Sequence, residues 1–343
     1  MKNQEALYSH TVTDETALKY GSHKINFTQL KSLTSDFGIR QFPIDNAAGN
    51  TFAGYTLNDN AMALIVQCAR YEFEKDASDI IYIKTYLDFI QHCFQPEGYF
   101  LNYVDDKGVF TKQNDSCNLA DINGKAIWAL GRLISLSSIL PLELSETAEQ
   151  IVKQFFFKIN SIHSKQAMAF AVKGLYYYNL ERRSDEVNLI IKGMANRLEQ
   201  MYNHSAEKNW NWFESYVEPG DCILSEALLY AYSATGELRY KDISKTSFDF
   251  FLSGTFSKNN PITDHKRIHT SELSQIILTL GYFYKEFNDS GYLIKMQNAF
   301  SMLAADKQKN MDSHQCTDAI VNYLHAGLMM ENYFLPQNKP DLQ

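Results

Sequence analysis

The sequence predicts an all-α protein with an (α/α)6 toroid fold, in which six helical hairpins close into a ring. Three observations predict it. Long windows carry apolar residues at the i, i+3, i+4 and i+7 positions of an amphipathic helix. They alternate with windows that are apolar nearly all round, as expected for helices covered on most sides. The enclosed windows recur roughly every 50 residues, the length of one helical hairpin with its loops.

The amphipathic windows include residues 80–94, 151–159 and 187–201, and each keeps a polar face that can meet water. We expect these helices to form the outer ring. The enclosed windows lack a polar stripe and are expected to form the inner ring: residues 61–69, 126–136, 167–178, 223–232, 273–284 and 319–330. Only seven prolines and sixteen glycines occur, too few for a β protein with many turns.

An open superhelix of hairpins would show the same alternation and is the alternative to a closed ring. The closed ring is favoured because the repeats resemble one another only in pattern and their loops vary in length. No linker rich in proline, glycine or serine interrupts the chain. We therefore predict a single domain over residues 1–343, with residues 1–25 as a polar N-terminal segment and residues 336–343 as a tail.

Charge and composition argue against several functions. The net charge of −8 and the pI of about 5.6 leave no basic field for phosphate backbones, so no nucleic-acid partner is expected. The N-terminus lacks the pattern of a secretory signal, and no stretch reaches the roughly 20 apolar residues of a membrane span. The five cysteines are scattered and odd in number, which fits reduced thiols. A cytoplasmic protein without a membrane partner is the expectation.

The turns before the inner helices gather at one mouth of a toroid. Helix N-termini offer free N–H groups and a partial positive charge, which suit polar ligands. At the first turn, Asp59 either faces a ligand or caps its helix, a role that Asn58 can take instead. At the second turn, Asp121 either faces a ligand or pairs with Lys125, one helical turn further on. Gly124 in the same turn lets another backbone or a ligand come close.

The fourth turn, residues 210–221 (WNWFESYVEPGD), is the richest in candidate ligand-binding side chains. Its acids include Glu214 and Asp221, and its aromatic residues include Trp210, Trp212 and Tyr216. A sugar site needs flat aromatic faces beside acids, because one face of a pyranose stacks on a ring while its hydroxyls bind carboxylates. The alternative is a loop whose aromatic side chains only seal the rim.

Glu272 and Asp318 open the fifth and sixth inner helices. Acids favour helix N-termini for dipole reasons alone, so a structural role is the alternative to ligand binding. His265 and His269 are four residues apart, but they lie in a polar loop without an H-E-x-x-H pattern, so no zinc site is expected. No P-loop, dinucleotide or G-x-S-x-G motif occurs, and no metal or organic cofactor is implied.

Four segments resemble a bacterial family of six-hairpin toroids that is related to glycoside hydrolases. Residues 33–41 (LTSDFGIRQ) resemble its entry segment L-T-D-D-x-G-I-x-Q, and residues 54–65 (GYTLNDNAMALI) resemble G-Y-x-x-D-D-N-A-R-A-L-I. Residues 121–131 (DINGKAIWALG) resemble D-x-x-G-R-A-L-W-A-L-G, and residues 212–229 resemble W-F-E-x-x-L-x-Y-D-N-A-R-L-P-x-A-L-L. The resemblance implies the toroid and a carbohydrate ligand. It also implies a possible functional link to a glycosyltransferase, because the family is often encoded beside or fused to one.

By position, the resemblance carries over five site residues: Asp59, Asn60, Asp121, Glu214 and Asp221. The chain departs from the family at other polar positions, which here read Asn58 for an acid, Met62 and Lys125 for arginines, Ala120 for an acid, Pro219-Gly220 for Tyr-Asp and Phe42 for a histidine. The apolar scaffold thus matches the family, while part of the polar lining of the expected site differs. These differences affect the expected catalysis more than the expected fold.

We expect a carbohydrate-active protein that acts on glycosidic bonds of a glycan or oligosaccharide through paired carboxylates. One acid would protonate the leaving oxygen while the second carboxylate activates water. Asp59 and Glu214 are the expected pair, because the first and fourth inner helices face each other across a six-helix ring, and Asp121 is the reserve. The aromatic residues expected to stack on the substrate are Tyr55, Trp210 and Trp212. Further expected substrate-binding residues are Asn60, Lys125, Tyr216, Asp221, Glu272 and Asp318.

Two alternatives come from other functional classes. The first is a non-catalytic glycan-binding or partner protein on a degenerate glycosidase scaffold. The second is a sugar epimerase, which would need paired histidines at the base of the pocket.

Overall fold

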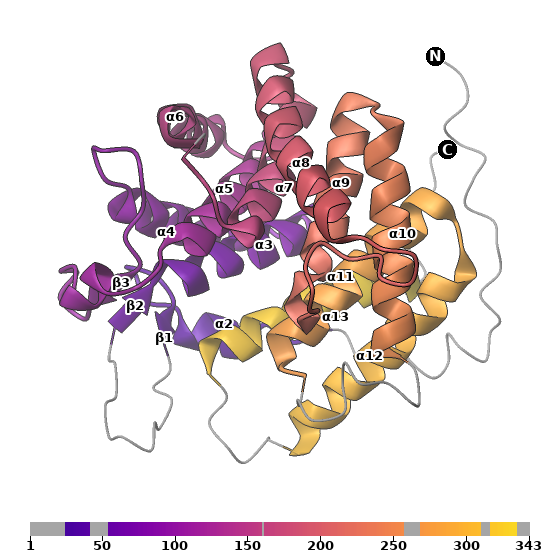
Figure 1. The fold of residues 1–343 in the computed structure, drawn as a ribbon. Helices are drawn as coiled ribbons and strands as arrows, with labels where there is room; N and C mark the ends of the chain where they lie inside the picture. Colours follow the sequence, from indigo (N-terminus) through magenta and orange to yellow (C-terminus); the bar gives the residue numbers. More distant parts are fainter. Residues whose placement is uncertain (1–24, 42–53, 160, 257–267, 310–315, 335–343) are drawn as a thin grey trace, which may run out of the picture.

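The computed structural model describes residues 25–41, 54–159, 161–256, 268–309 and 316–334. Helices dominate this part of the chain, and they alternate between a nearly enclosed helix and a half-exposed one, as predicted (Figure 1). The expected N-terminal segment and C-terminal tail lie outside the described residues, apart from Ile25. None of the described helices combines the length and hydropathy needed to cross a bilayer.

Six helices form the inner ring: α3 (Leu57–Glu74), α5 (Ala120–Ile134), α7 (Lys165–Glu181), α9 (Cys222–Thr235), α11 (Thr270–Phe287) and α13 (Thr317–Phe334). Each packs against the next in this order, and α13 packs against α3. The last contact joins the two ends of the series, so the closed ring is confirmed over the open superhelix. It also places α3 opposite α9 and α7 opposite α13.

The outer ring consists of α2 (Thr28–Leu33), α4 (Asp79–Cys93), α6 (Leu142–Ile159), α8 (Asp185–Ser205), α10 (Leu238–Thr255) and α12 (Ser290–Lys309). Each predicted amphipathic window lies almost wholly within one of these helices. In α8, for example, Val187, Ile191 and Leu198 are buried, while the opposite face meets water. The fold therefore follows from helical periodicity, because each outer helix turns one apolar stripe toward the inner ring.

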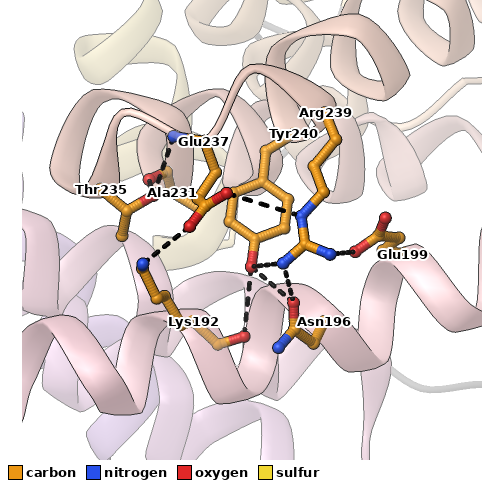
Figure 2. Close-up of polar contacts among 8 residues, drawn as sticks. All are labelled: Lys192, Asn196, Glu199, Ala231, Thr235, Glu237, Arg239 and Tyr240. Carbon is orange, nitrogen blue, oxygen red and sulfur yellow. Dashed lines mark hydrogen bonds and ion pairs between the residues drawn. The ribbon is translucent and has the colours of Figure 1, made fainter.

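Polar contacts join α8 to α10, and they include the buried Tyr240 side chain (Figure 2). The Tyr240 hydroxyl donates a hydrogen bond of 2.6 Å to Asn196, and Lys192 pairs with Glu237 at 2.7 Å. Both members of the ion pair are partly exposed, and such pairs contribute about 0–1 kcal/mol each. These contacts orient neighbouring hairpins, whereas the buried apolar core supplies most of the stability.

Glycines set the spacing between α5 and α7. A Cβ atom on Gly131 would lie 2.0 Å from the carbonyl oxygen of Gly174, and one on Gly124 would lie 2.6 Å from the carbonyl oxygen of Ala167. Only a residue without a side chain allows such close backbone contact. The close approach predicted at Gly124 is therefore confirmed, and it draws the first turns of α5 and α7 together at the mouth.

Three short strands form an antiparallel sheet that the sequence did not indicate, in the order β1 (Arg40–Gln41), β2 (Gly54–Thr56) and β3 (Tyr103–Asp105). Tyr55 pairs with Arg40 on one side and Val104 on the other. The strands are two or three residues long, too short for a period-two pattern to stand out in the sequence. Because β2 leads directly into α3, the sheet fixes where α3 begins.

Candidate functional site at the mouth of the toroid

The first turn of α3 holds the most perturbed carboxyl group of the mouth. The helix is capped by Thr56, whose hydroxyl accepts a hydrogen bond from the Asp59 backbone N–H, so neither Asn58 nor Asp59 is the N-cap. Asp59 is only 2% exposed. Burial, and then the charge of Asp318, raise its pKa from 3.8 to about 6. Its Oδ2 atom has no hydrogen-bond partner among the described residues.

Asn58 links Asp59 to the neighbouring helix α13. Its Nδ2 atom donates to Asp59 Oδ1 at 3.3 Å and to Asp318 Oδ1 at 3.4 Å. Its Oδ1 atom accepts a hydrogen bond of 2.8 Å from Lys125 of α5. Asn58, Asp59, Lys125 and Asp318 thus form one hydrogen-bonded group, the Asp59 cluster. The alternative in which Lys125 pairs with Asp121 is wrong, because α3 and α5 pack side by side and bring Asn58 within reach of Lys125.

A second group, the Lys165 triad, consists of Lys165 of α7, Glu214 and Asp221. Lys165 forms ion pairs with both acids, and its distance to Asp221 is 2.8 Å. Gln166 donates a further hydrogen bond of 2.9 Å to Asp221, which is fully buried. Burial alone would lower the pKa of Lys165, but the hydrogen bonds from its ammonium group to the two acids hold it above its ordinary value.

The two groups lie on opposite sides of the ring, because Asp59 begins α3 and Asp221 precedes α9. Asp59 and Glu214 were the expected catalytic pair. Glu214 is already neutralised by Lys165, so it is poorly placed to accept a proton or to attack a substrate. Asp121, the reserve, accepts a hydrogen bond from the Ser164 hydroxyl, the group that also caps α7.

Three expected binding residues are buried and held by internal contacts, so they are not placed to bind a substrate. Trp212 is wholly buried and stacks on Phe251 with ring centroids 5.6 Å apart. The Tyr55 ring is buried against Phe37 and Phe89, and its hydroxyl lies 3.0 Å from Ser35 Oγ. Asn60 accepts a hydrogen bond of 2.8 Å from Ile39 N–H and donates to two backbone carbonyls.

Asn60 has a structural counterpart one hairpin later. It is the fourth residue of α3, and Asn123 is the fourth residue of α5. Asn123 accepts a hydrogen bond of 2.8 Å from Phe100 N–H and donates to the Phe100 and Leu119 carbonyls. Each asparagine therefore clamps the backbone of a preceding segment onto its helix, which satisfies buried amide groups.

The remaining aromatic residues stay near the rim. Trp210 is partly exposed, and its indole N–H donates to the Glu214 carbonyl at 2.6 Å. Tyr216 is 51% exposed, with the Lys165 ammonium 5.1 Å from its ring centre. Glu272 forms a capping box with His269 at the start of α11. Glu272 therefore has the structural role at a helix N-terminus that the sequence offered as the alternative to ligand binding.

Sequence reasoning missed the polar partners that organise these groups, namely Asn58 as a bridge, Ser164, Lys165 and Gln166. Their positions in the sequence could have revealed them, because each falls within the first turn or the cap of an inner helix. Within the described residues, no group of three or more histidine, cysteine, aspartate or glutamate side chains is arranged to hold a metal ion. His265 lies outside the described residues.

No protein-family model matches this chain, and no curated protein matches it by sequence. Solved structures do match. The cellobiose 2-epimerase from Bacillus thermoamylovorans B4167 superposes with a TM-score of 0.66 at 11% identity, covering 92% of this chain and 99% of that chain. A D-mannose isomerase gives a TM-score of 0.64 at 12% identity, with coverages of 92% and 94%.

A third similar structure is an inactive variant of the α-1,6-mannanase GH76A of Salegentibacter sp. HEL1_6, in complex with α-1,6-mannotriose. It has a TM-score of 0.60 at 11% identity, and the match covers 87% of this chain and 94% of that chain. At such identities the similarity shows the fold. The chain has the six-hairpin glycosidase-like (α/α)6 toroid.

Proposed function

We propose that this protein is a carbohydrate-active enzyme that cleaves a glycosidic bond, with Asp59 as the general acid and Asp318 as its partner carboxylate. The observation that carries the proposal is the state of Asp59. Its pKa of about 6 lies near neutral pH, and its Oδ2 atom has no partner among the described residues. A carboxyl group with a raised pKa can hold a proton and deliver it to a leaving oxygen.

Asp318 replaces Glu214 in the proposed pair. It accepts a hydrogen bond from the same Asn58 amide group that contacts Asp59, and it is partly exposed. Among the residues that the structure describes, Asp318 has no ion pair of the kind that Glu214 forms with Lys165. Glycoside hydrolysis uses two carboxyl groups of this kind, one acid and one base or nucleophile. Asp318 would activate water or attack the sugar while Asp59 protonates the departing oxygen.

The charge of the mouth supports a neutral carbohydrate as the substrate. Asp121, the two acids of the Lys165 triad and the two acids of the Asp59 cluster outnumber Lys125 and Lys165. A carboxylated, sulfated or phosphorylated sugar would meet like charges there. Neutral sugars also appear in the names of three similar structures: the cellobiose 2-epimerase, the D-mannose isomerase and the α-1,6-mannanase. We therefore expect neutral oligosaccharides to be the substrates.

The test is to incubate the protein with cellobiose and α-1,6-mannotriose, and then with a panel of neutral oligosaccharides, and to measure new reducing ends and product structures. Asp59→Asn and Asp318→Asn should each lower turnover at least about 100-fold, the usual contribution of acid–base catalysis. Asp88→Asn is the matched control, because Asp88 is an exposed residue of α4. Turnover that survives both cluster substitutions would contradict the proposal.

A non-catalytic glycan-binding protein is the second candidate. The Lys165 triad favours it, because Glu214 and Asp221 are held in ion pairs and are unavailable for chemistry. Sugar binding by the wild-type protein without turnover of any sugar in the panel would support this candidate. The epimerase alternative is less well supported, because His325 alone among the described histidines lies on an inner helix.

A further inference from the structure

The outer helix α8 borders a solvent-open groove that the proposed function does not use. The groove has a volume of about 530 Å³, and the end of α6 and His163 form its other wall. On α8 its lining residues recur at i, i+3, i+4, i+7, i+8 and i+11, the spacing of a single helix face. We call them the α8 face: Glu186, Leu189, Ile190, Gly193, Met194 and Arg197. This helix belongs to the outer ring, so the α8 face lies on the flank of the toroid (Figure 1).

The centre of the α8 face is apolar and contains a glycine. Leu189 is 69% exposed, and Met194 is buried at the floor of the groove. Gly193 is exposed, and a Cβ atom built on it would meet nothing within 4 Å. The described part of the chain therefore gives no reason for a glycine here, although glycine in the middle of a helix is less stable than alanine. A position without a side chain leaves room for an incoming helix.

Opposite charges lie at the two ends of the α8 face. Glu186 stands in the first turn of α8, and Arg197 stands roughly three helical turns later. Arg197 donates a hydrogen bond of 3.1 Å to His163, but neither Arg197 nor Glu186 forms an ion pair with a described residue. The α8 face thus has a negative end and a positive end, with apolar residues and a glycine between them.

This pattern is complementary to itself when two copies of α8 run antiparallel. In such a pair, each step toward the C-terminus of one helix is a step toward the N-terminus of the other. The register that brings Glu186 opposite Arg197 of the second copy therefore also brings Ile190 opposite Gly193 of the second copy. Each contact occurs twice about a twofold axis, which is the arrangement of an isologous interface. The space above Gly193 accommodates the larger Ile190 side chain.

We propose that the protein forms a twofold-symmetric homodimer through the α8 face, with α8 of a second copy occupying the groove. In this register Leu189 of each copy lies opposite Met194 of the other, so the exposed leucine is removed from water. The two pairs of Glu186 with Arg197 fix the register and the orientation of the helices. Because α8 runs from the far end of the ring toward the mouth, the two mouths point in opposite directions. The inference is independent of the proposed function.

Sedimentation equilibrium of the full chain tests the inference. One helix face makes a small interface, so we expect a micromolar dissociation constant. The mass should rise from one chain of 39.4 kDa toward two as the concentration increases. Glu186→Arg and Arg197→Glu should each weaken dimerisation at least about tenfold, because each places like charges opposite one another. The double variant should restore the wild-type affinity, since it forms both pairs with the signs exchanged.

Gly193→Gln tests the centre of the α8 face. It should abolish the dimer, while the monomer keeps its stability because the added side chain meets no described atom at its Cβ. Asp88→Arg is the control for charge reversal, because Asp88 is exposed on α4 and lies outside the groove, and it should leave dimerisation unchanged. A wild-type protein that stays monomeric at high micromolar concentration would overturn the inference. A dimer that survives Gly193→Gln, or a double charge reversal that fails to restore affinity, would also overturn it.

Discussion

Lys173 of α7 and Glu226 of α9 form an ion pair of 2.8 Å inside the ring of helices, where their side chains are 3% and 1% exposed. The two residues lie 53 positions apart in the chain, one on each of two neighbouring hairpins. Removing two charges from water is costly, and the cost is offset only when the partners satisfy one another's hydrogen bonds. The pair therefore fixes the register of α7 against α9.

Removing one member of this pair should be far worse than removing both. Lys173→Met or Glu226→Leu alone leaves a buried charge without its partner and should cost about 3–5 kcal/mol of unfolding free energy. The double variant should recover most of that loss, because neither charge remains. Chemical denaturation of the three variants and the wild type completes the cycle. Additive losses in the double variant would argue against a coupled pair.

The raised pKa of Asp59 predicts a pH dependence of stability. A carboxyl group with a folded pKa of about 6 and an ordinary value of 3.8 binds its proton more tightly in the folded protein. Its contribution to stability is therefore present below pH about 4 and is lost as the pH rises through 6, by on the order of 3 kcal/mol. Asp59→Asn should flatten this part of the profile. Urea denaturation between pH 4 and 8 measures it, and identical slopes in both proteins would contradict the assignment.

The same carboxyl group should shape the pH dependence of activity. If Asp59 is the general acid, its protonated form is the active one, so kcat/KM should fall as the pH rises above about 6. The basic limb should disappear from the residual activity of Asp59→Asn. If the kcat/KM of Asp59→Asn still falls above pH about 6, the catalytic proton belongs to another group.

Gly131 should not tolerate a methyl group. The Cβ atom of Gly131→Ala would lie 2.0 Å from the Gly174 carbonyl oxygen, and two helix backbones cannot yield as a flexible side chain can. We expect a loss of about 1–3 kcal/mol or more. Gly193→Ala is the matched control in α8, where a Cβ meets nothing within 4 Å, and it should gain about 0.5–1 kcal/mol. Thermal and urea unfolding of both variants tests the contrast.

The two tryptophans of the 210–221 segment should respond differently to truncation. Trp212→Ala removes a wholly buried ring and should cost about 3–5 kcal/mol of stability. Trp210→Ala removes a partly exposed ring at the rim and should affect sugar affinity more than stability. Denaturation and calorimetry on both variants separate these effects. A larger stability loss for Trp210 would reverse the assignment.

The sequence by itself determined the ring of hairpins, because the apolar period of a helix is a property of that helix alone. Windows that are apolar all round, such as residues 167–178, needed cover on every side, and only neighbouring helices could supply it. A close approach at Gly124 could be predicted as well, because the absence of a side chain is visible in the sequence. Only the structure shows that the Ala167 backbone of α7 makes this approach. Asp59 could be named because it falls in the first turn of an enclosed helix.

The tertiary structure alone decided what each polar side chain does. Trp210 and Trp212 are two residues apart, yet one reaches the rim and the other the core, because the path of their loop sets which side faces in. Lys125 binds Asn58 instead of the nearer Asp121 once α3 and α5 are side by side. The pKa of Asp59 and the neutral state of His325 depend on burial and on charges from other hairpins. Periodicity is local, whereas partners and electrostatics come from packing between distant parts of the chain.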